Sequence, residues 1–154
     1  MRPNLPVYLK LAFIVLLLGS FFTQAEARKI TLGVKPGLHF DPKVLHVLPG
    51  EDVELTFDNS DVMMHNFVLV KPGARMEIVE AANALGEKGP ALHYVPDSAK
   101  VLAATPVVQP KNKSTVKFKA PVKEGNYPYV CTFPGHGFLM HGTLFVAKNE
   151  PKEL

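Results

Sequence analysis

Residues 127–140 read YPYVCTFPGHGFLM, an apolar run followed by a turn that carries three sulfur and nitrogen donors. Cys131 follows the run Tyr127–Val130, which is typical of a strand buried on both faces. Four residues separate Cys131 from His136, and three separate His136 from Met140. Because the chain turns at Pro134-Gly135 and an alternating stretch follows Met140, we expect a loop between two strands that directs the three side chains to one point.

The donor chemistry of this loop favours copper. A trigonal set of two histidines and a cysteine, with a long axial methionine, is typical of electron-transfer copper. That set requires a second histidine, and His65 is the best candidate because it directly precedes the apolar stretch Asn66–Val70. The alternatives are an inert buried thiol at Cys131, a surface histidine at His136, a core histidine at His65 and a packing methionine at Met140.

The rest of the chain predicts a β-sandwich. Fourteen prolines and eleven glycines indicate many turns. Apolar residues alternate with polar residues or glycine in four stretches, which are Ile30/Leu32/Val34, Val53/Leu55/Phe57, Val116/Phe118/Ala120 and Leu144/Val146. Short strands at this spacing are typical of an antiparallel sandwich.

One segment departs from the alternation with period two. Between Ala74 and Leu85, the apolar residues Met76, Val79, Ala82 and Leu85 are three positions apart, which predicts a helix. The segment from Gly86 to Pro106 is expected to be a loop between two strands of the same sandwich. We expect no second domain.

Two motifs resemble a known family. Met64-His65-Asn66-Phe67-Val68-Leu69 and Cys131-Thr-Phe-Pro-Gly-His136, followed by Leu139-Met140 and Gly142-Thr143-Leu144, resemble the azurin and auracyanin branch of the cupredoxins. The resemblance covers most of the chain after residue 27. It implies an all-β, cupredoxin-like Greek-key sandwich of about eight strands with a short helical flap, and one mononuclear type 1 copper per chain.

The resemblance also implies a ligand set. His65, Cys131 and His136 correspond to the equatorial ligands and Met140 to the weak axial one. The backbone carbonyl of Met64 falls where azurins place a glycine carbonyl opposite the methionine. The chain departs from azurins in having methionine there, and in having a single cysteine, which leaves it without the disulfide that azurins usually carry.

Residues around the expected ligands have predicted supporting roles. Asn66 is expected to link the two ligand segments through its side chain, and backbone amides near Asn66 and Phe133 to hydrogen-bond the sulfur. In this family the histidine of the ligand loop has an edge exposed in an apolar patch. The residues expected to form that docking patch here are Met63, Pro134 and Phe138.

The function predicted from these features is one-electron transfer by a copper site that cycles between Cu(I) and Cu(II). Expected partners are redox proteins, such as cytochromes or dehydrogenases and oxidases, that dock transiently on a monomer. The alternative is a periplasmic protein that binds or delivers copper without redox turnover. An enzyme is disfavoured, because His-x-His pairs for further copper are absent and Cys131 with His136 lacks an orienting acid. The net charge of +3, without a basic run, does not indicate nucleic acid.

The N-terminal residues predict export. Arg2 and Lys10 are basic, Leu11–Phe22 is apolar, and Ala25-Glu26-Ala27 has the small-x-small form of a cleavage site. We expect residues 1–27 to be a secretory signal cut after Ala27 and residues 28–154 to be the copper domain. The protein would then be periplasmic or secreted, with no stable membrane insertion. The alternative is an uncleaved leader that anchors the protein to a membrane.

Overall fold

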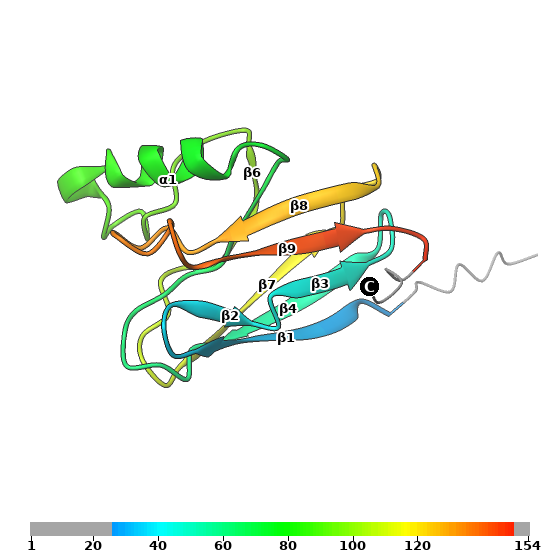
Figure 1. Ribbon diagram of the computed structural model, residues 1–154, viewed down its shortest axis with the longest axis horizontal. Helices are drawn as coiled ribbons and strands as arrows, with labels where there is room; N and C mark the ends of the chain where they lie inside the picture. The colour runs from blue at the N-terminus through cyan, green and yellow to red at the C-terminus, as the bar shows by residue number, and fades with distance from the viewer. Residues whose placement is uncertain (1–25, 150–154) are drawn as a thin grey trace, which may run out of the picture.

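The computed structural model describes residues 26–149 as strands and short helices joined by turns (Figure 1). The strands are β1 Arg28–Lys35, β2 His39–Asp41, β3 Val44–Val47, β4 Asp52–Asp58, β5 Val68–Val70, β6 Val101–Ala104, β7 Lys113–Lys119, β8 Gly125–Val130 and β9 His141–Val146. The helices are α1 Arg75–Asn83 and a 3₁₀ turn, η2 Gly86–Lys88. The expected secretory signal lies outside the described residues, apart from its last two positions.

The strands form two sheets. One has four strands in the order β2-β1-β4-β7, and the other has five in the order β3-β9-β8-β5-β6. The β1–β4 and β3–β9 pairs are parallel, and the remaining strand pairs among residues 26–149 are antiparallel. The predicted all-β sandwich is therefore confirmed, whereas the expected antiparallel pairing is wrong for these two parallel pairs.

The space between the sheets is filled by the alternating residues. On β4, Val53, Leu55 and Phe57 are at most 1% exposed, whereas their neighbours are partly exposed. The rings of Phe67 and Tyr129 are 5.4 Å apart in the centre of this core. Period-two alternation thus predicts which face of each strand is buried.

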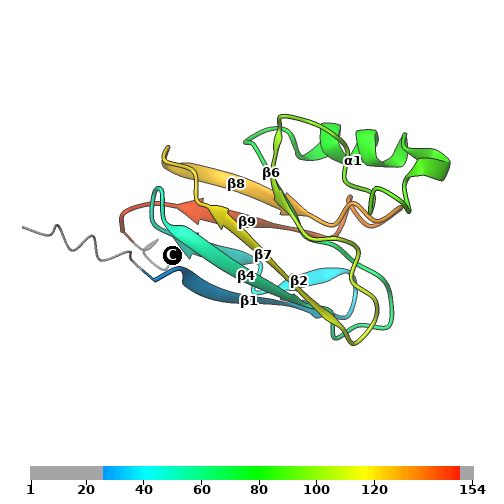
Figure 2. The same cartoon turned by 180° about the vertical axis from the view of Figure 1, so that it is seen from behind.

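The helix α1 covers the outer face of the five-stranded sheet (Figure 2). It confirms the helix expected between Ala74 and Leu85, although the buried residues are not all those whose spacing predicted it. Ile78, Val79 and Ala82 are buried, while Met76 is only partly buried. Among the helices of residues 26–149, none has the length and apolar character needed to cross a membrane.

The segment expected to be a loop contains a strand, so that prediction is wrong over Val101–Ala104. This strand, β6, pairs with β5 at the edge of the five-stranded sheet. Val101 and Ala104 also pack against the cluster under α1. An edge strand of four residues has too few alternating positions to give a clear sequence pattern.

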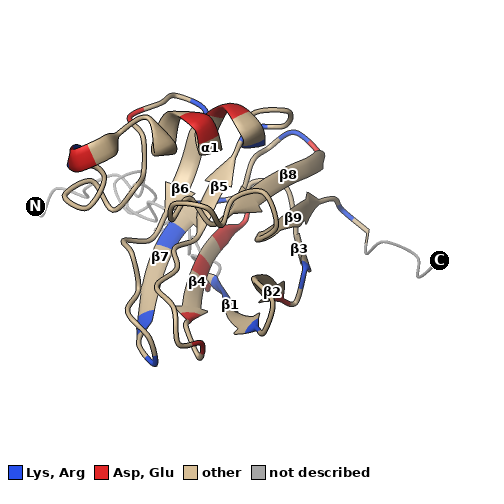
Figure 3. Ribbon diagram, turned by 60° about the vertical axis from the view of Figure 1, so that its left-hand side comes forward, with Lys and Arg blue, Asp and Glu red and all other residues tan. Residues whose placement is uncertain are grey.

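Basic positions on β7 lie beside acidic positions on β4 in the four-stranded sheet (Figure 3), and three ion pairs join the two strands. The lysines of β7 remain between 62% and 75% exposed, as expected of a solvated face. The pairs are Lys113–Asp58 at 2.7 Å, Lys117–Glu54 at 3.0 Å and Lys119–Asp52 at 3.0 Å.

Candidate metal centre

The ligand loop joins β8 to β9, and its two ends are hydrogen-bonded to each other. Cys131 directly follows β8 and Met140 directly precedes β9, and the Cys131 N–H donates to the Met140 carbonyl at 3.0 Å. Inside the loop, the Met140 N–H donates to the His136 carbonyl at 2.9 Å. Gly135 makes the turn with a φ of 82°, a region that favours glycine. These contacts hold the three predicted donors on one short, closed loop.

His65 reaches the same end of the sandwich from another segment. Its N–H donates to the Val108 carbonyl at 3.2 Å, and the Val108 N–H donates to the His65 carbonyl at 2.7 Å. The side chain of His65 is fully buried, although it lies before β5 begins. The fold therefore brings His65 to the ligand loop from more than sixty positions away in the sequence.

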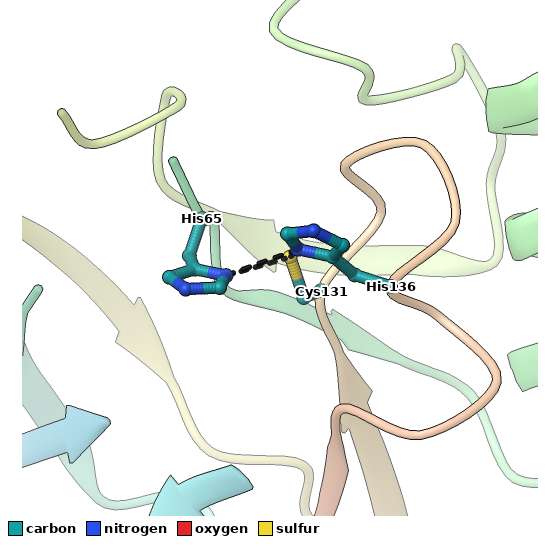
Figure 4. A group of neighbouring side chains, drawn as sticks. All are labelled: His65, Cys131 and His136. Atoms are coloured by element: carbon teal, nitrogen blue, oxygen red, sulfur yellow. Dashed lines mark hydrogen bonds between the residues drawn. The ribbon is translucent and has the colours of Figure 1, made fainter. Parts of the chain in front are cut away.

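Three donor atoms converge at this point (Figure 4). The Nδ1 atoms of His65 and His136 are 3.1 Å apart. The Cys131 Sγ lies 3.8 Å from the first nitrogen and 3.7 Å from the second. Met140 is fully buried in the same core cluster as Cys131. Its axial role, and that of the Met64 carbonyl, stay predictions, as do the other ligand assignments.

The three donors fit a metal ion. A point equidistant from these atoms lies about 2.1 Å from each, close to the roughly 2.0–2.3 Å bonds that imidazole nitrogen and thiolate sulfur make to zinc. The set of two imidazoles and one thiolate is also the trigonal set that type 1 copper takes. The geometry and the chemistry of the donors are therefore both those of a first-row metal site.

Burial governs the protonation of the donors. It raises the pKa of the Cys131 thiol to about 11, although backbone N–H groups of Asn66 and Phe133 hydrogen-bond the sulfur and oppose this shift. Burial, followed by the neighbouring His65, lowers the pKa of His136. Without a metal the thiol is therefore protonated and His136 neutral at pH 7, and a bound cation favours the thiolate.

Asn66 joins the two ligand segments. Its Oδ1 accepts the Thr132 N–H at 2.8 Å, and its Nδ2 donates to the Thr132 Oγ1 at 2.8 Å and to the His93 carbonyl at 2.9 Å. Asn66 and Thr132 are both buried. Because each ligand lies next to one of these residues, the paired side chains fix the separation of His65 and Cys131.

Two contacts at the site involve residues that sequence reasoning missed. The Asp61 carboxylate accepts a hydrogen bond from the His65 Nε2–H at 3.1 Å. Arg75, at the start of α1, donates to the Gly137 carbonyl of the ligand loop at 2.9 Å. An aspartate four residues before a histidine was the signal available for the first contact. The second depends on how the helix packs, which no local pattern encodes.

The surface beside the site is apolar. His136 is 8% exposed, whereas His65 is completely buried. Of the predicted docking residues, Met63 and Phe138 are 41% and 59% exposed, and Pro134 is exposed as well. Val62 and Leu139, which sequence reasoning did not single out, are exposed next to them in the sequence. Exposed apolar side chains thus lie on both segments that carry the ligands.

Comparison with known proteins agrees with this geometry. Residues 28–147 match the family described as copper binding proteins of the plastocyanin/azurin family. The chain is 41% identical over 111 residues to auracyanin-A of Chloroflexus aurantiacus, a match that covers 71% of this chain. It is 38% identical over 87 residues to azurin of Pseudomonas aeruginosa, covering 54% of this chain.

A solved structure shares the fold. The structure of auracyanin A from Chloroflexus aurantiacus, described as a "blue" copper protein, superposes with a TM-score of 0.70 at 39% identity. The superposition covers 77% of this chain and 98% of that chain. In sequence, the match spans 67% of the length of auracyanin-A and 57% of the length of azurin.

Proposed function

Because the chain belongs to the plastocyanin/azurin family of copper-binding proteins, we propose that it carries single electrons between redox proteins. The observation that carries this proposal is the convergence of His65, Cys131 and His136 at one buried point. Copper bound there would supply a reversible one-electron couple. Its cofactor is copper, as in its family.

The protein would hold the copper ion with buried side chains whose positions are fixed by the fold. Cys131 would bind as a thiolate, and His65 and His136 through their Nδ1 atoms, with Met140 as the weak axial ligand. The loop's closing hydrogen bonds and the Asn66–Thr132 pair hold these donors before metal arrives. Donors that are fixed in advance move little between the two oxidation states, which keeps electron transfer fast.

The route out of the site would run through His136. This imidazole approaches the surface, while His65 does not. We propose that the apolar patch of Met63, Pro134 and Phe138 receives the partner, since a small apolar face suits brief redox encounters. We also propose that residues 1–27 direct export, and that residues 28–154 work as a monomer in the periplasm or outside the cell.

The experiment that tests the proposal is a redox titration of the copper-loaded protein. We expect an intense thiolate-to-copper band in the visible spectrum, lost on reduction with ascorbate and restored by ferricyanide. Cys131→Ser should abolish the band. Met76→Leu, which changes a partly buried methionine of α1 itself, should leave it unchanged.

The same samples distinguish transfer from delivery. An electron carrier keeps its copper through repeated cycles in the presence of a Cu(I) chelator. A delivery protein loses its copper to the chelator on the first reduction. Weak absorption in the loaded wild-type protein would rule out a copper–thiolate bond and with it the proposed function.

A further inference from the structure

Asp61 connects the loop before His65 to the ring of that histidine. Its Oδ1 accepts the Val62 N–H at 2.6 Å, and its Oδ2 accepts the His65 Nε2–H at 3.1 Å. The Asp61 N–H in turn donates to the Oδ1 of Asn59 at 3.1 Å. The Asp61 side chain is 16% exposed and lies against the fully buried His65 side chain.

This contact determines which nitrogen of His65 faces the donors. An ionised carboxylate only accepts hydrogen bonds, so the proton of the neutral ring lies on Nε2 and the lone pair on Nδ1. That Nδ1 is the atom 3.1 Å from the His136 Nδ1 and 3.8 Å from the Cys131 sulfur. The hydrogen bond from Nε2 to Asp61 therefore orients the His65 ring so that its Nδ1 lone pair faces the other two donors.

We propose that Asp61 is a positioning residue that prepares His65 for copper and lowers the reduction potential of the site. This inference rests on the proposed function. A carboxylate bonded to a ligand histidine fixes the ring's orientation and makes it a stronger donor. Its negative charge, 3.1 Å from the His65 ring, also stabilises Cu(II) over the less positive Cu(I).

Two variants of Asp61 separate the two effects. Asp61→Asn keeps the size of the side chain and one acceptor but removes the charge. Asp61→Ala removes the hydrogen bond as well. Asp97→Asn is the matched control, because Asp97 is exposed on the segment before β6 and its change removes the same charge.

The first measurement is the reduction potential of the copper-loaded variants. We expect Asp61→Asn to shift the ratio of oxidised to reduced protein roughly tenfold toward reduced at a fixed potential, a rise of about 59 mV for one electron. Asp97→Asn should change the potential by a small fraction of this. Equal potentials in wild-type protein and Asp61→Asn would overturn the electrostatic role.

The second measurement is Zn(II) affinity, found by competition with a chelator, which involves no redox chemistry. Loss of an outer partner of a metal ligand typically costs about 10- to 100-fold in affinity, and we expect that loss in Asp61→Ala. The Asp97→Asn control should bind Zn(II) as wild-type protein does. An unchanged affinity in Asp61→Ala would overturn the positioning role.

The third measurement needs no metal at all. Nitrogen-15 spectra of the metal-free protein should place the His65 proton on Nε2 in the wild type, with that preference lost in Asp61→Ala. A wild-type proton on Nδ1 would overturn the proposal even if the protein carries electrons. Conversely, a wild-type protein with the Nε2 proton but no copper–thiolate band would contradict the proposed function and leave the orienting contact intact.

Discussion

Burial and the nearby backbone amides have opposite effects on the pKa of the Cys131 thiol. The side chain is completely buried, which favours the neutral thiol and raises its pKa to about 11. The N–H groups of Asn66 and Phe133 favour the thiolate but do not outweigh burial. A metal ligand must be deprotonated, so metal loading at neutral pH releases the thiol proton. The same burial keeps the metal-free thiol unreactive.

The raised pKa makes the stability of the metal-free protein depend on alkaline pH. In the unfolded chain the thiol ionises near pH 9.0, while in the folded protein it stays protonated until about pH 11. The folded state therefore holds more protons in this window, and we expect the free energy of unfolding to fall by about 3 kcal/mol or less as pH rises through it. Urea denaturation at pH 8 and pH 11 measures this loss.

Cys131→Ser is the control for that measurement. Burial also raises the pKa of Tyr129, so both proteins should lose some stability at high pH. The difference between the wild type and the serine variant isolates the thiol. Equal losses in the two proteins would contradict the assignment of a raised pKa to Cys131.

At the scale of elements, α1 holds the ligand loop against the sheet. Arg75 bonds to the Gly137 carbonyl, and Val79 packs where a side chain at position 137 would stand. A Cβ on Gly137 would lie 2.5 Å from the Val79 Cγ2 and 3.1 Å from the Cys131 carbonyl oxygen. A real Cβ cannot approach a stiff β-branched side chain so closely, so glycine is required for this contact.

Gly137→Ala should therefore destabilise the protein by about 1–3 kcal/mol, as overpacking of a dense contact does. Chemical denaturation gives this value, and the visible spectrum of the copper-loaded variant reports any shift of the loop. In a Val79→Ala background the cost of the same change should shrink, because the clashing methyl groups are gone. Strict additivity of the two substitutions would show that α1 does not constrain the loop.

The sequence predicted the strands in which apolar and polar residues alternate, because the alternation itself indicates which side chains are buried. The alternation of Val53, Leu55 and Phe57 predicted a strand with one buried face, and the structure confirms it. The family resemblance carried by the ligand motifs is confirmed as well. The spacing of Cys131 and His136 predicted their convergence, because a short loop keeps its own residues close.

The features missed depend on neighbours that local patterns do not record. β6 is a strand because its backbone pairs with β5, not because its side chains alternate clearly. Ile78 is buried because the side of α1 that carries it packs against Val68, Val70 and Val130 of the sheet. Asp61 hydrogen-bonds His65 because of the path that the backbone takes between β4 and β5, and sequence spacing alone does not predict that path.

At the scale of the whole molecule, the metal site is a product of folding. His65 comes from a segment that pairs with Val108, whereas Cys131 and His136 come from the loop between β8 and β9. Only the folded sandwich brings these segments within bonding distance of one ion. Metal affinity and folding stability are therefore linked.

This linkage predicts that Zn(II) stabilises the folded protein. At free metal about 1,000 times the dissociation constant, the gain is about 4 kcal/mol, visible as a rise in the unfolding temperature. Removing the metal with a chelator should reverse the rise. Cys131→Ser should show little of it, and an equal rise in that variant would mean that zinc stabilises the protein from another place.

The ion pairs between β7 and β4 bear on how copies of this protein meet one another. Exposed pairs of this kind contribute little to stability. However, β7 is the outer strand of its sheet, and an outer strand with free backbone groups is a template for aggregation. Lys113, Lys117 and Lys119 place a row of positive charge along it. Two copies approaching edge to edge would bring these lysines together, and their repulsion would disfavour pairing of the two edges.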